Sequence, residues 1–545
     1  MSTTGSFSLS GKIADLMQGK FYQGTVNVVN GRIASITPDN NTNSNLIIPG
    51  LIDAHVHIES SMLIPSEFAR LAVVHGTTAT VSDPHEIANV LGIDGVEFMI
   101  CNGKKVPFRF YFGAPSCVPA TGFETSGAVL GVQEMENLMS RSEILYMAEM
   151  MNYPGVLFKD ETVMAKLEVA KKYNKPVDGH APGLKGEQAR SYIESGITTD
   201  HECFTLEEAL DKIRFGMKVQ IREGSAAKNF DALIPLLDLH PEMVLFCSDD
   251  KHPDDLIRGH INLLVKKAIA LGYDPMRVLQ SAILNPVKHY KLDAGLLQVG
   301  DPADMVVIDN LHDFNVLETY VGGELVAAKG KTLIKGVSTE TPNSFVAAHL
   351  QTDDIYVADS ENPLKIIKAI EGQLITDQII DFPASNKGAL MSCTEKDYLK
   401  IVVLNRYKPS KPVVGFIHGF GLKTGALAST VAHDSHNIIA VGVEDDQIVE
   451  AINAIIDAKG GIVALSSGKK QLLPLPVAGL MSADDGYKVA ADYELIDGFV
   501  KEAGCKLHAP FMTLSFMALL VIPKFKISDL GLFDGDTFAF TPLTA

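Results

Sequence analysis

The sequence is poor in cysteine, and its few cysteines are widely separated. The 545 residues include six cysteines, and no two of them form a Cys-x-x-Cys pair. They are Cys101, Cys117, Cys203, Cys247, Cys393 and Cys505. This spacing argues against a disulfide framework and against a zinc knuckle with thiolate ligands. We therefore expect reduced cysteines in the core of an intracellular protein.

Basic clusters and long apolar segments are also missing. The chain carries 47 basic and 66 acidic residues, for a net charge of -19, and no Lys/Arg run that could follow a phosphate backbone. We therefore exclude nucleic acid as a partner. The longest apolar stretch, Phe511 to Pro523, is shorter than the ~20 residues of a membrane helix. Residues 1–5 lack the features of a secretory signal, so we expect a cytoplasmic protein that is not bound to a membrane.

Between about Gly50 and Asn285, short β-prone segments that end in polar residues alternate with helix-like stretches. This alternation indicates parallel β/α units, and eight of them fit a closed (β/α)8 TIM-like barrel. A doubly wound open sheet is the alternative, but no Gly-x-Gly-x-x-Gly motif follows the first strand. The eight expected strand segments are Ile52–Ile58, Thr77–Asp83, Arg109–Ala114, Leu145–Met151, Pro176–His180, Ile197–His201, Lys218–Arg222 and Val244–Asp249.

The segments that flank the barrel have a different pattern. Residues 1–49 and 290–336 are rich in short alternating stretches and turns, so we expect them to form one small β-sandwich together. The polar residues 337–344 suggest a boundary. We therefore expect an α/β protein with three parts: this sandwich, a barrel at 50–289, and a C-terminal α/β domain at 345–545.

Two histidines, His55 and His57, close the first expected strand. Side chains alternate along a strand, so both point to the same face, about 6 to 7 Å apart. That separation lets them hold one metal ion. Short histidine patterns also recur by chance, so the pair alone leaves metal binding open.

Further candidate ligands end other strands. His180, His201 and Asp249 close the fifth, sixth and eighth, and in a barrel these ends meet at the C-terminal face, where active sites lie. Four histidines and an aspartate leave coordination positions for water, as metal-assisted hydrolysis requires. Glu149, on the fourth strand, is costly to bury unless it is paired or bound to metal, so we expect it to bridge two cations. A glutamate on a helix surface is the alternative.

Longer motifs resemble a known family. Residues 49–57 resemble the first-strand signature of the amidohydrolase superfamily, and the later His, His and Asp follow the order of that superfamily. The resemblance narrows to the adenine deaminase family of bacteria and archaea, and it covers nearly the whole chain. The segments that carry it are 58–62, 82–89, 178–183, 222–225, 248–251 and 510–523.

This resemblance implies a metal-dependent hydrolase barrel and an adenine-deaminase-type domain at 345–545. It implies conversion of adenine to hypoxanthine and ammonia, a reaction of purine salvage, at a binuclear metal centre. The implied ligands are His55, His57, Glu149, His180, His201 and Asp249. Imidazole and carboxylate suit Mn(II), Fe(II) or Zn(II), and the family implies manganese or iron first. The His-x-Glu and Pro-Cys-x-x-Cys signature of cytidine-deaminase-type zinc sites is absent.

The expected mechanism needs a base and a second acid. A metal-activated water attacks the ring carbon that carries the amino group, and Asp249 takes its proton and passes it to ammonia. A second acid must protonate the adjacent ring nitrogen; Glu86 or His85 is the first choice, followed by Glu223. Glu86 and His85 could instead simply start a helix. Glu223 could instead form a surface ion pair with Arg222.

The sequence of the C-terminal domain gives fewer indications of function. Residues 415–421 and 431–437 suggest a loop that reaches the barrel mouth, a subunit contact or ordinary turns. Residues 466–470 lack the first glycine and the final Ser/Thr of a phosphate loop, which argues against nucleoside triphosphate binding. We also expect a homo-oligomer, namely a dimer.

Two rival functions remain open at this point. One is an amidohydrolase that acts on another purine or a cyclic amide. Hydantoinase-like members of that kind usually carry a lysine where this chain has Glu149. The other is a non-catalytic scaffold, which would be expected to lose metal ligands, yet all six are present.

Overall fold

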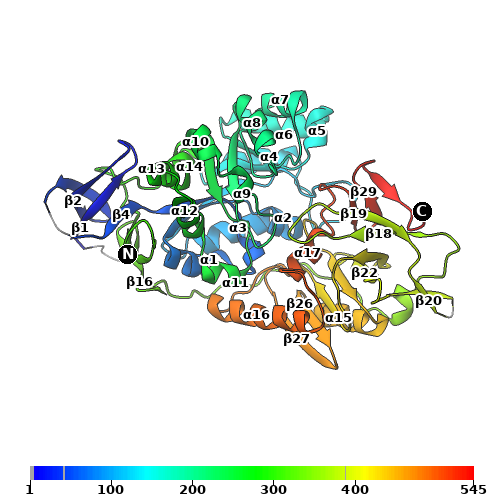
Figure 1. Cartoon of the computed structure of the whole chain (residues 1–545). Coiled ribbons are helices and arrows are strands. Elements are labelled where there is room, and N and C mark those ends of the chain that lie inside the picture. The colour runs from blue at the N-terminus through cyan, green and yellow to red at the C-terminus, as the bar shows by residue number, and fades with distance from the viewer. Residues whose placement is uncertain (1–4, 41–42, 387) are drawn as a thin grey trace.

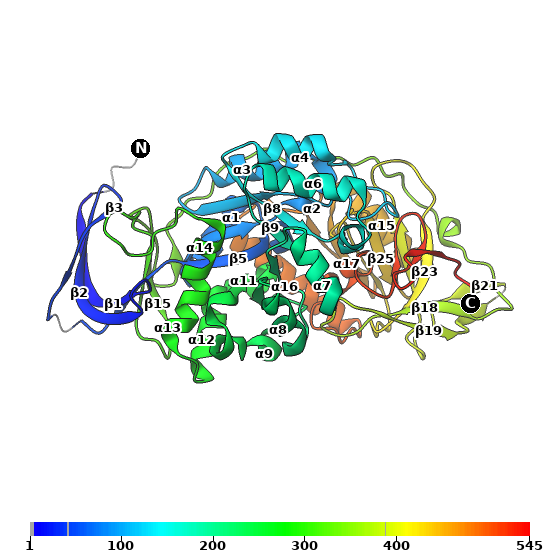
Figure 2. The same cartoon turned by 90° about the horizontal axis from the view of Figure 1, so that it is seen from above.

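Residues 5–40, 43–386 and 388–545 are described by the computed structural model of the chain. Seen from above, the N-terminal strands lie at one end, the barrel lies in the middle, and the C-terminal strands lie at the other end (Figure 2). Figure 1 shows helix α16 (Gly486–Glu502) running beneath the barrel, so the C-terminal residues also lie beside the barrel wall.

The central sheet is a closed barrel of parallel strands. The N–H of Thr198 donates to the carbonyl of Val177 at 2.8 Å and joins β9 to β10, while β13 pairs with β5 and closes the ring. The predicted barrel is therefore confirmed, and the open-sheet alternative is wrong. The strands are β5 (Leu51–His57), β6 (Thr77–Ser82), β7 (Arg109–Ala114), β8 (Ile144–Met150), β9 (Val177–Gly179), β10 (Thr199–Asp200), β11 (Lys218–Arg222), β12 (Val244–Cys247) and β13 (Asp249–Asp250).

Helices cover the outside of the barrel. Helix α8 begins at Leu206 because the Thr205 side chain accepts a hydrogen bond from the N–H of Glu208, which satisfies a free donor of the first turn. No helix among the described residues is long and apolar enough to cross a membrane. The helices are α1 (Pro65–Ala72), α2 (His85–Leu91), α3 (Ile93–Gly103), α4 (Val132–Met139), α5 (Tyr153–Leu157), α6 (Glu161–Lys172), α7 (Gly186–Glu194), α8 (Leu206–Arg214), α9 (Phe230–Leu233), α10 (Leu236–Leu239), α11 (Pro253–Arg258), α12 (Ile261–Ala270), α13 (Pro275–Leu279) and α14 (Asn285–Tyr290).

Apolar side chains from several strands meet in one buried cluster. Ile52, Val81, Tyr146 and Leu245 come from four different strands, and Tyr290 of α14 packs against them. Small residues accompany these large ones, so the layers interdigitate as in other barrels. The resulting packed core fixes the strand ends and therefore the polar residues that follow them.

Both flanks of the barrel contribute to one eight-stranded sheet. Strand β4 pairs in parallel with β1 and antiparallel with β14, and it thereby joins the N-terminal strands to those after the barrel. The two flanks thus meet as expected, while the division of the chain into domains stays a prediction. The strands are β1 (Phe7–Asp15), β2 (Lys20–Val29), β3 (Arg32–Pro38), β4 (Leu46–Pro49), β14 (Met305–Ile308), β15 (Val316–Val321), β16 (Glu324–Ala328) and β17 (Lys331–Thr332).

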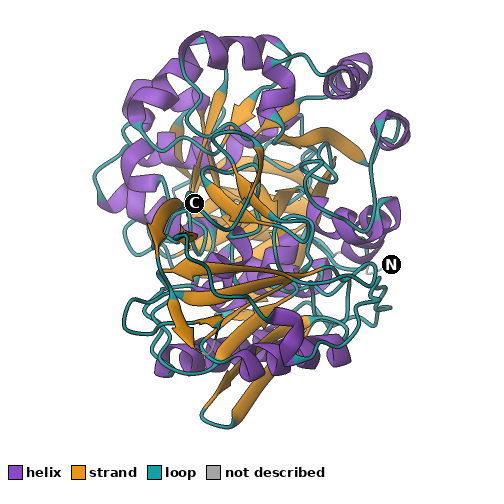
Figure 3. Cartoon of the chain, turned by 90° about the vertical axis from the view of Figure 1, so that its right-hand side faces the viewer, coloured by secondary structure: helices purple, strands orange, loops and turns teal. Residues whose placement is uncertain are grey.

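The C-terminal residues contain a second eight-stranded sheet, in the order β19-β18-β23-β22-β25-β24-β26-β27. Figure 3 shows strands in the interior of the molecule and helices mostly along its margins. The strands are β18 (Leu364–Lys368), β19 (Asp377–Asp381), β20 (Ala384–Asn386), β21 (Ala389–Met391), β22 (Leu399–Leu404), β23 (Val413–His418), β24 (Ala426–Ser429), β25 (Ile438–Gly442), β26 (Gly461–Ser466), β27 (Lys469–Pro474), β28 (Phe525–Ile527), β29 (Leu532–Asp534) and β30 (Ala539–Thr541). The helices are α15 (Asp445–Ala458), α16 and α17 (Pro510–Phe516).

The C-terminal region, residues 345–545, is tied to the barrel by polar contacts. Arg70 Nη1 of α1 lies 2.8 Å from Asp485 Oδ2, and the N–H of Thr125 donates to Asp529 Oδ1 at 2.9 Å. These contacts hold the C-terminal region against the barrel.

Candidate metal centre

The two histidines of β5 face one carboxylate. His55 Nε2 lies 3.6 Å and His57 Nε2 lies 3.2 Å from Asp249 Oδ1. Asp249 reaches them because β13 pairs with β5 and places it beside Val56. The three side chains are at most 6% exposed. The strand geometry expected from the sequence therefore directs both imidazoles to the same point.

Glu149, near the end of β8, lies between this pair and a second pair of histidines. Its Oε1 is 3.4 Å from His57 Nε2. Its Oε2 is 2.8 Å from His180 Nδ1 and 3.2 Å from His201 Nε2. The carboxylate presents one oxygen to each pair, which is the arrangement of a bridging ligand. The helix-surface alternative for this residue is wrong, because Glu149 is buried in a strand.

Buried ring nitrogens without hydrogen-bond partners make this cluster fit a cation site. Among the described residues, both nitrogens of His55, Nδ1 of His201 and Nε2 of His180 are buried without such a partner. An unsatisfied buried polar group costs about 1–3 kcal/mol, and coordination would remove that cost for the ring nitrogen that binds the ion. Burial and the neighbouring His201 hold the pKa of His55 well below its ordinary value, which favours the neutral form that binds metals.

The donor set also matches a divalent cation. His55, His57 and Asp249 form one group of converging ligand atoms, and His55, Glu149 and His201 form another. These donors are imidazole nitrogen and carboxylate oxygen without sulfur, a set that fits Mn(II), Fe(II) and Zn(II). The structure thus brings all six ligands implied by the sequence into one buried cluster at the mouth of the barrel.

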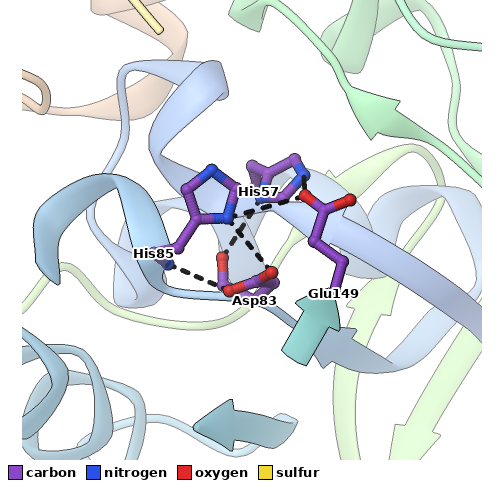
Figure 4. Close-up of side chains that lie close together, drawn as sticks. All are labelled: His57, Asp83, His85 and Glu149. Carbon is purple, nitrogen blue, oxygen red and sulfur yellow. Dashed lines mark hydrogen bonds and ion pairs between the residues drawn. The ribbon is translucent and has the colours of Figure 1, made fainter. Parts of the chain in front are cut away.

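His85 lies against the same cluster, next to Asp83 (Figure 4). Asp83 follows β6, and its Oδ1 accepts from the backbone N–H of His85 at 3.0 Å, where α2 begins. His85 Nδ1 lies 3.1 Å from Asp83 Oδ2 and 3.6 Å from Glu149 Oε1. His85 therefore starts helix α2 and also lies at the site. The two interpretations of this residue, a helix start and a site residue, are compatible.

Glu86, the next residue of α2, points toward the C-terminal region. Its Oε1 contacts His433 Nδ1, and its Oε2 contacts His436 Nε2. Only 1% of Glu86 is exposed. Burial raises the pKa of Glu86, but the two histidines outweigh this effect and hold the pKa well below its ordinary value. Glu86 is therefore an ionised carboxylate between two imidazoles.

A buried arginine lies behind Asp249. Arg222 Nη1 is 2.5 Å from Asp249 Oδ2, and Arg222 Nη2 is 3.0 Å from Glu202 Oε2. Burial raises the pKa of Asp249, but Arg222 and the nearby histidines lower it well below its ordinary value. Asp249 thus has one oxygen bound by the guanidinium and the other directed at His55 and His57.

The structure corrects the expectation for Glu223. Its side chain lies 3.5 Å from Lys267 Nζ and 4.0 Å from Lys228 Nζ, and it is 20% exposed. The side chains of Arg222 and Glu223 point in opposite directions, as alternation at the end of a strand dictates. Glu223 is therefore outside the site. The ion pair that we considered between Arg222 and Glu223 is also wrong, since Arg222 faces inward.

A small cavity lies over the cluster. The C-terminal region contributes part of its lining, namely Leu374, His433, Asp434, Phe516 and Leu519. The segment 431–437 thus reaches the barrel mouth, which was one of the alternatives for it, whereas residues 415–421 are not in the lining.

Several residues of this cavity escaped the sequence analysis. Glu202 and Asp250 line it, and each is an acid that directly follows a candidate ligand, which was a usable signal. Phe516 and Leu374 carried no such signal, because no local pattern separates them from ordinary core residues.

Comparison with known proteins supplies the family. Residues 46–326 match the model of the amidohydrolase family, and residues 373–539 match that of the adenine deaminase C-terminal domain. Among solved structures, a β-aspartyl dipeptidase from Fervidobacterium islandicum AW-1 covers 61% of this chain and 100% of its own, with 17% identity and a TM-score of 0.45.

Relatives that match over nearly the full length are more informative. A protein of Sulfurovum sp. strain NBC37-1, named adenine deaminase, is 54% identical over 96% of this chain and 97% of its own length. One of Salinibacter ruber with the same name is 52% identical over 98% of both chains. The chain belongs to the adenine deaminase family within the amidohydrolases.

Proposed function

We propose that this protein is an adenine deaminase, which hydrolyses adenine to hypoxanthine and ammonia in purine salvage. The observation that carries the proposal is the cluster of four histidines and two carboxylates at the barrel mouth of a chain that belongs to this family. Adenine is the substrate. A cytoplasmic location and a dimeric assembly are part of the same proposal.

The enzyme uses divalent metal, as its family implies. We propose manganese or iron at a two-ion centre, with zinc as the third option. The residues that would hold the ions are His55, His57, Glu149, His180, His201 and Asp249. When bound, the ions supply Lewis acidity that brings the pKa of water to about 7, so that hydroxide is available at neutral pH.

Asp249 is the proposed base. Its Oδ1 lies on the histidine side of the cluster, and Arg222 binds its other oxygen and fixes the orientation of the carboxylate. From this position it accepts a proton from the attacking water and delivers it to the departing amino group. The transfer converts a poor amide-like leaving group into ammonia.

The ring nitrogen next to the reacting carbon must also gain a proton, because attack pushes an electron pair onto it. Glu86 and His85, the residues expected from the sequence for this step, both line the cavity. His85 Nε2 lies 3.4 Å from Glu86 Oε1, so the two side chains lie on the same side of the cavity. Glu223 has no part in this step, since it faces surface lysines.

A substrate panel tests this function. The purified enzyme, loaded with manganese, is incubated separately with adenine, guanine, hypoxanthine, hydantoin and buffer, and the products and ammonia are measured. We expect equal amounts of hypoxanthine and ammonia from adenine alone. Turnover of another purine or of hydantoin without turnover of adenine would refute the proposal in favour of another amidohydrolase. Inactivity toward all of them would favour a scaffold.

A further inference from the structure

A group of three buried residues joins the barrel mouth to the C-terminal region. Glu86 of α2 contacts His433 and His436, which lie about 350 residues later in the chain. Each of the three residues is at most 3% exposed. Glu86 and His433 also line the cavity over the metal cluster. The chemistry of this group therefore bears on the substrate.

Hydrogen bonding fixes the tautomer of His436 and argues against a third metal site here. The backbone N–H of Ala432 donates to His436 Nδ1 at 3.2 Å, so this nitrogen carries a lone pair. His436 Nε2 must then carry the proton, which it donates to Glu86 Oε2. A cation on Nε2 would require an imidazolate, with no proton on either nitrogen. His436 is therefore a hydrogen-bond donor that holds one oxygen of Glu86.

His433 binds the other oxygen of Glu86 through one ring nitrogen, and the second ring nitrogen of His433 stays free. Its Nδ1 is bound to Glu86 Oε1. Its Nε2 has no hydrogen-bond partner among the described residues, and Asp250 Oδ1 lies 3.8 Å away. Both oxygens of Glu86 are thus occupied by histidines. His85 also has ring nitrogens without a hydrogen-bond partner, but its Nδ1 lies 3.6 Å from Glu149 Oε1, on the side of the metal ligands, whereas His433 lies in the C-terminal wall of the cavity.

The surroundings keep His433 oriented and charged. Its ring stacks on Phe516, with centroids 5.1 Å apart and planes at 25°. Glu86, Asp250 and Asp434 face it, and the neutral ring of His436 lies beside it with centroids 5.7 Å apart. Burial lowers the pKa of His433, but Glu86 and Asp250 outweigh burial and raise the pKa to about 9. At neutral pH His433 therefore carries a proton on each nitrogen.

We propose that His433 is the acid that protonates the ring nitrogen of adenine, and that Glu86 is the residue that positions it. This inference rests on the proposed deamination. As the water oxygen bonds to the amino-bearing carbon, the electron pair of its double bond to nitrogen moves onto that nitrogen, which takes the proton of His433 Nε2. Asp249 transfers the water proton to the amino group, the C–N bond breaks, and ammonia leaves with its electron pair. The new carbonyl oxygen returns its hydroxyl proton to His433.

This assignment also gives the C-terminal region a chemical task. The barrel supplies the metal ligands and the base, while the C-terminal region supplies the ring acid and part of the cavity wall. A pyrimidine-like ring can then be attacked and protonated at once, from two sides of one cavity. The six metal ligands alone would not provide the second proton transfer.

Kinetics of the metal-loaded full chain test the proposal with the variants His433→Gln and Glu86→Gln. His418→Gln is the matched control, since His418 lies in the same C-terminal region but is absent from the cavity lining. We expect His433→Gln to lower kcat by about 10²–10⁴, with KM and bound metal changed by less than about threefold. We expect wild-type kcat/KM to fall above about pH 9, and we expect this alkaline limb to move to lower pH in Glu86→Gln, because the carboxylate that raises the pKa of His433 is lost.

The outcomes separate this proposal from the function on which it rests. If the wild type does not deaminate adenine, the proposed function fails. If the wild type is active and His433→Gln keeps kcat within about threefold, His433 is not the acid. A variant that raises KM alone also overturns the proposal, because His433 would then only bind substrate. Should His433→Gln fail to fold, an alkaline limb that stays in place in folded Glu86→Gln overturns it equally.

Discussion

Replacement of Arg222 by methionine removes the buried cation that faces two carboxylates. The guanidinium binds Glu202 through both terminal nitrogens and binds Asp249 through one of them. The side chains of Arg222 and Glu202 are 1% and 0% exposed. Methionine keeps much of the apolar length of the arginine without its charge. Glu202 and Asp249 would then remain buried with no cationic side chain between them.

The expected loss of stability follows from this burial. Removal of one partner of a buried ion pair costs about 3–5 kcal/mol. Glu202 Oε1 keeps two imidazoles nearby, His201 Nε2 at 3.5 Å and His180 Nδ1 at 3.7 Å. We therefore expect the lower end of the range, about 3 kcal/mol. For a domain of the size of this barrel, that loss lowers Tm by roughly 6–12 °C.

Thermal unfolding of the metal-loaded protein, followed by calorimetry, measures this effect. Glu223→Gln is the control, since this neighbouring side chain is partly exposed and faces surface lysines. We expect its Tm to stay within about 2 °C of the wild type. An Arg222→Met protein whose Tm also stays within about 2 °C of the wild type would refute the reasoning. Removal of one partner of a buried ion pair should lower the free energy of unfolding by more than such a small shift allows.

Two further predictions concern metal binding and pH. Glu149→Gln should lower the bound metal, measured by mass spectrometry of the purified protein, to about one ion per chain or less, since the bridging carboxylate is lost; an unchanged metal content would contradict the bridging role. Burial lowers the pKa of Lys526 to about 7, and its Nζ donates to the carbonyls of Leu374 and Phe516. Between about pH 7 and pH 10 the unfolded chain binds a proton that the folded chain lacks, so stability rises with pH. Lys526→Met should lose this rise in Tm between pH 6 and pH 9, and a variant that keeps it would show that another group is responsible.

The barrel and most of the candidate site could be predicted from local sequence. His55 and His57 share a strand face because of alternation, and parallel strand ends converge wherever a barrel closes. These two rules, applied to Glu149, His201 and Asp249, already bring the ligands together. Both rules require only the order of the strands in the chain, because consecutive strands of such a barrel are neighbours.

Contacts between distant segments could not be predicted in the same way. Glu86 and His433 lie 347 residues apart, and their meeting depends on how the C-terminal region docks on the barrel. Arg222 and Glu223 illustrate a different limit. Alternation says that the two side chains face opposite ways, but only the register of β11 between its neighbours decides which one points inward.

Titration of metal-free protein with Mn(II) tests whether deamination depends on two bound metal ions. Bound metal and conversion of adenine to hypoxanthine are measured on the same samples. We expect no turnover without metal and a rise that levels off at two ions per chain. Full turnover in metal-free protein, or tight binding of two ions without any loss of adenine, would contradict it.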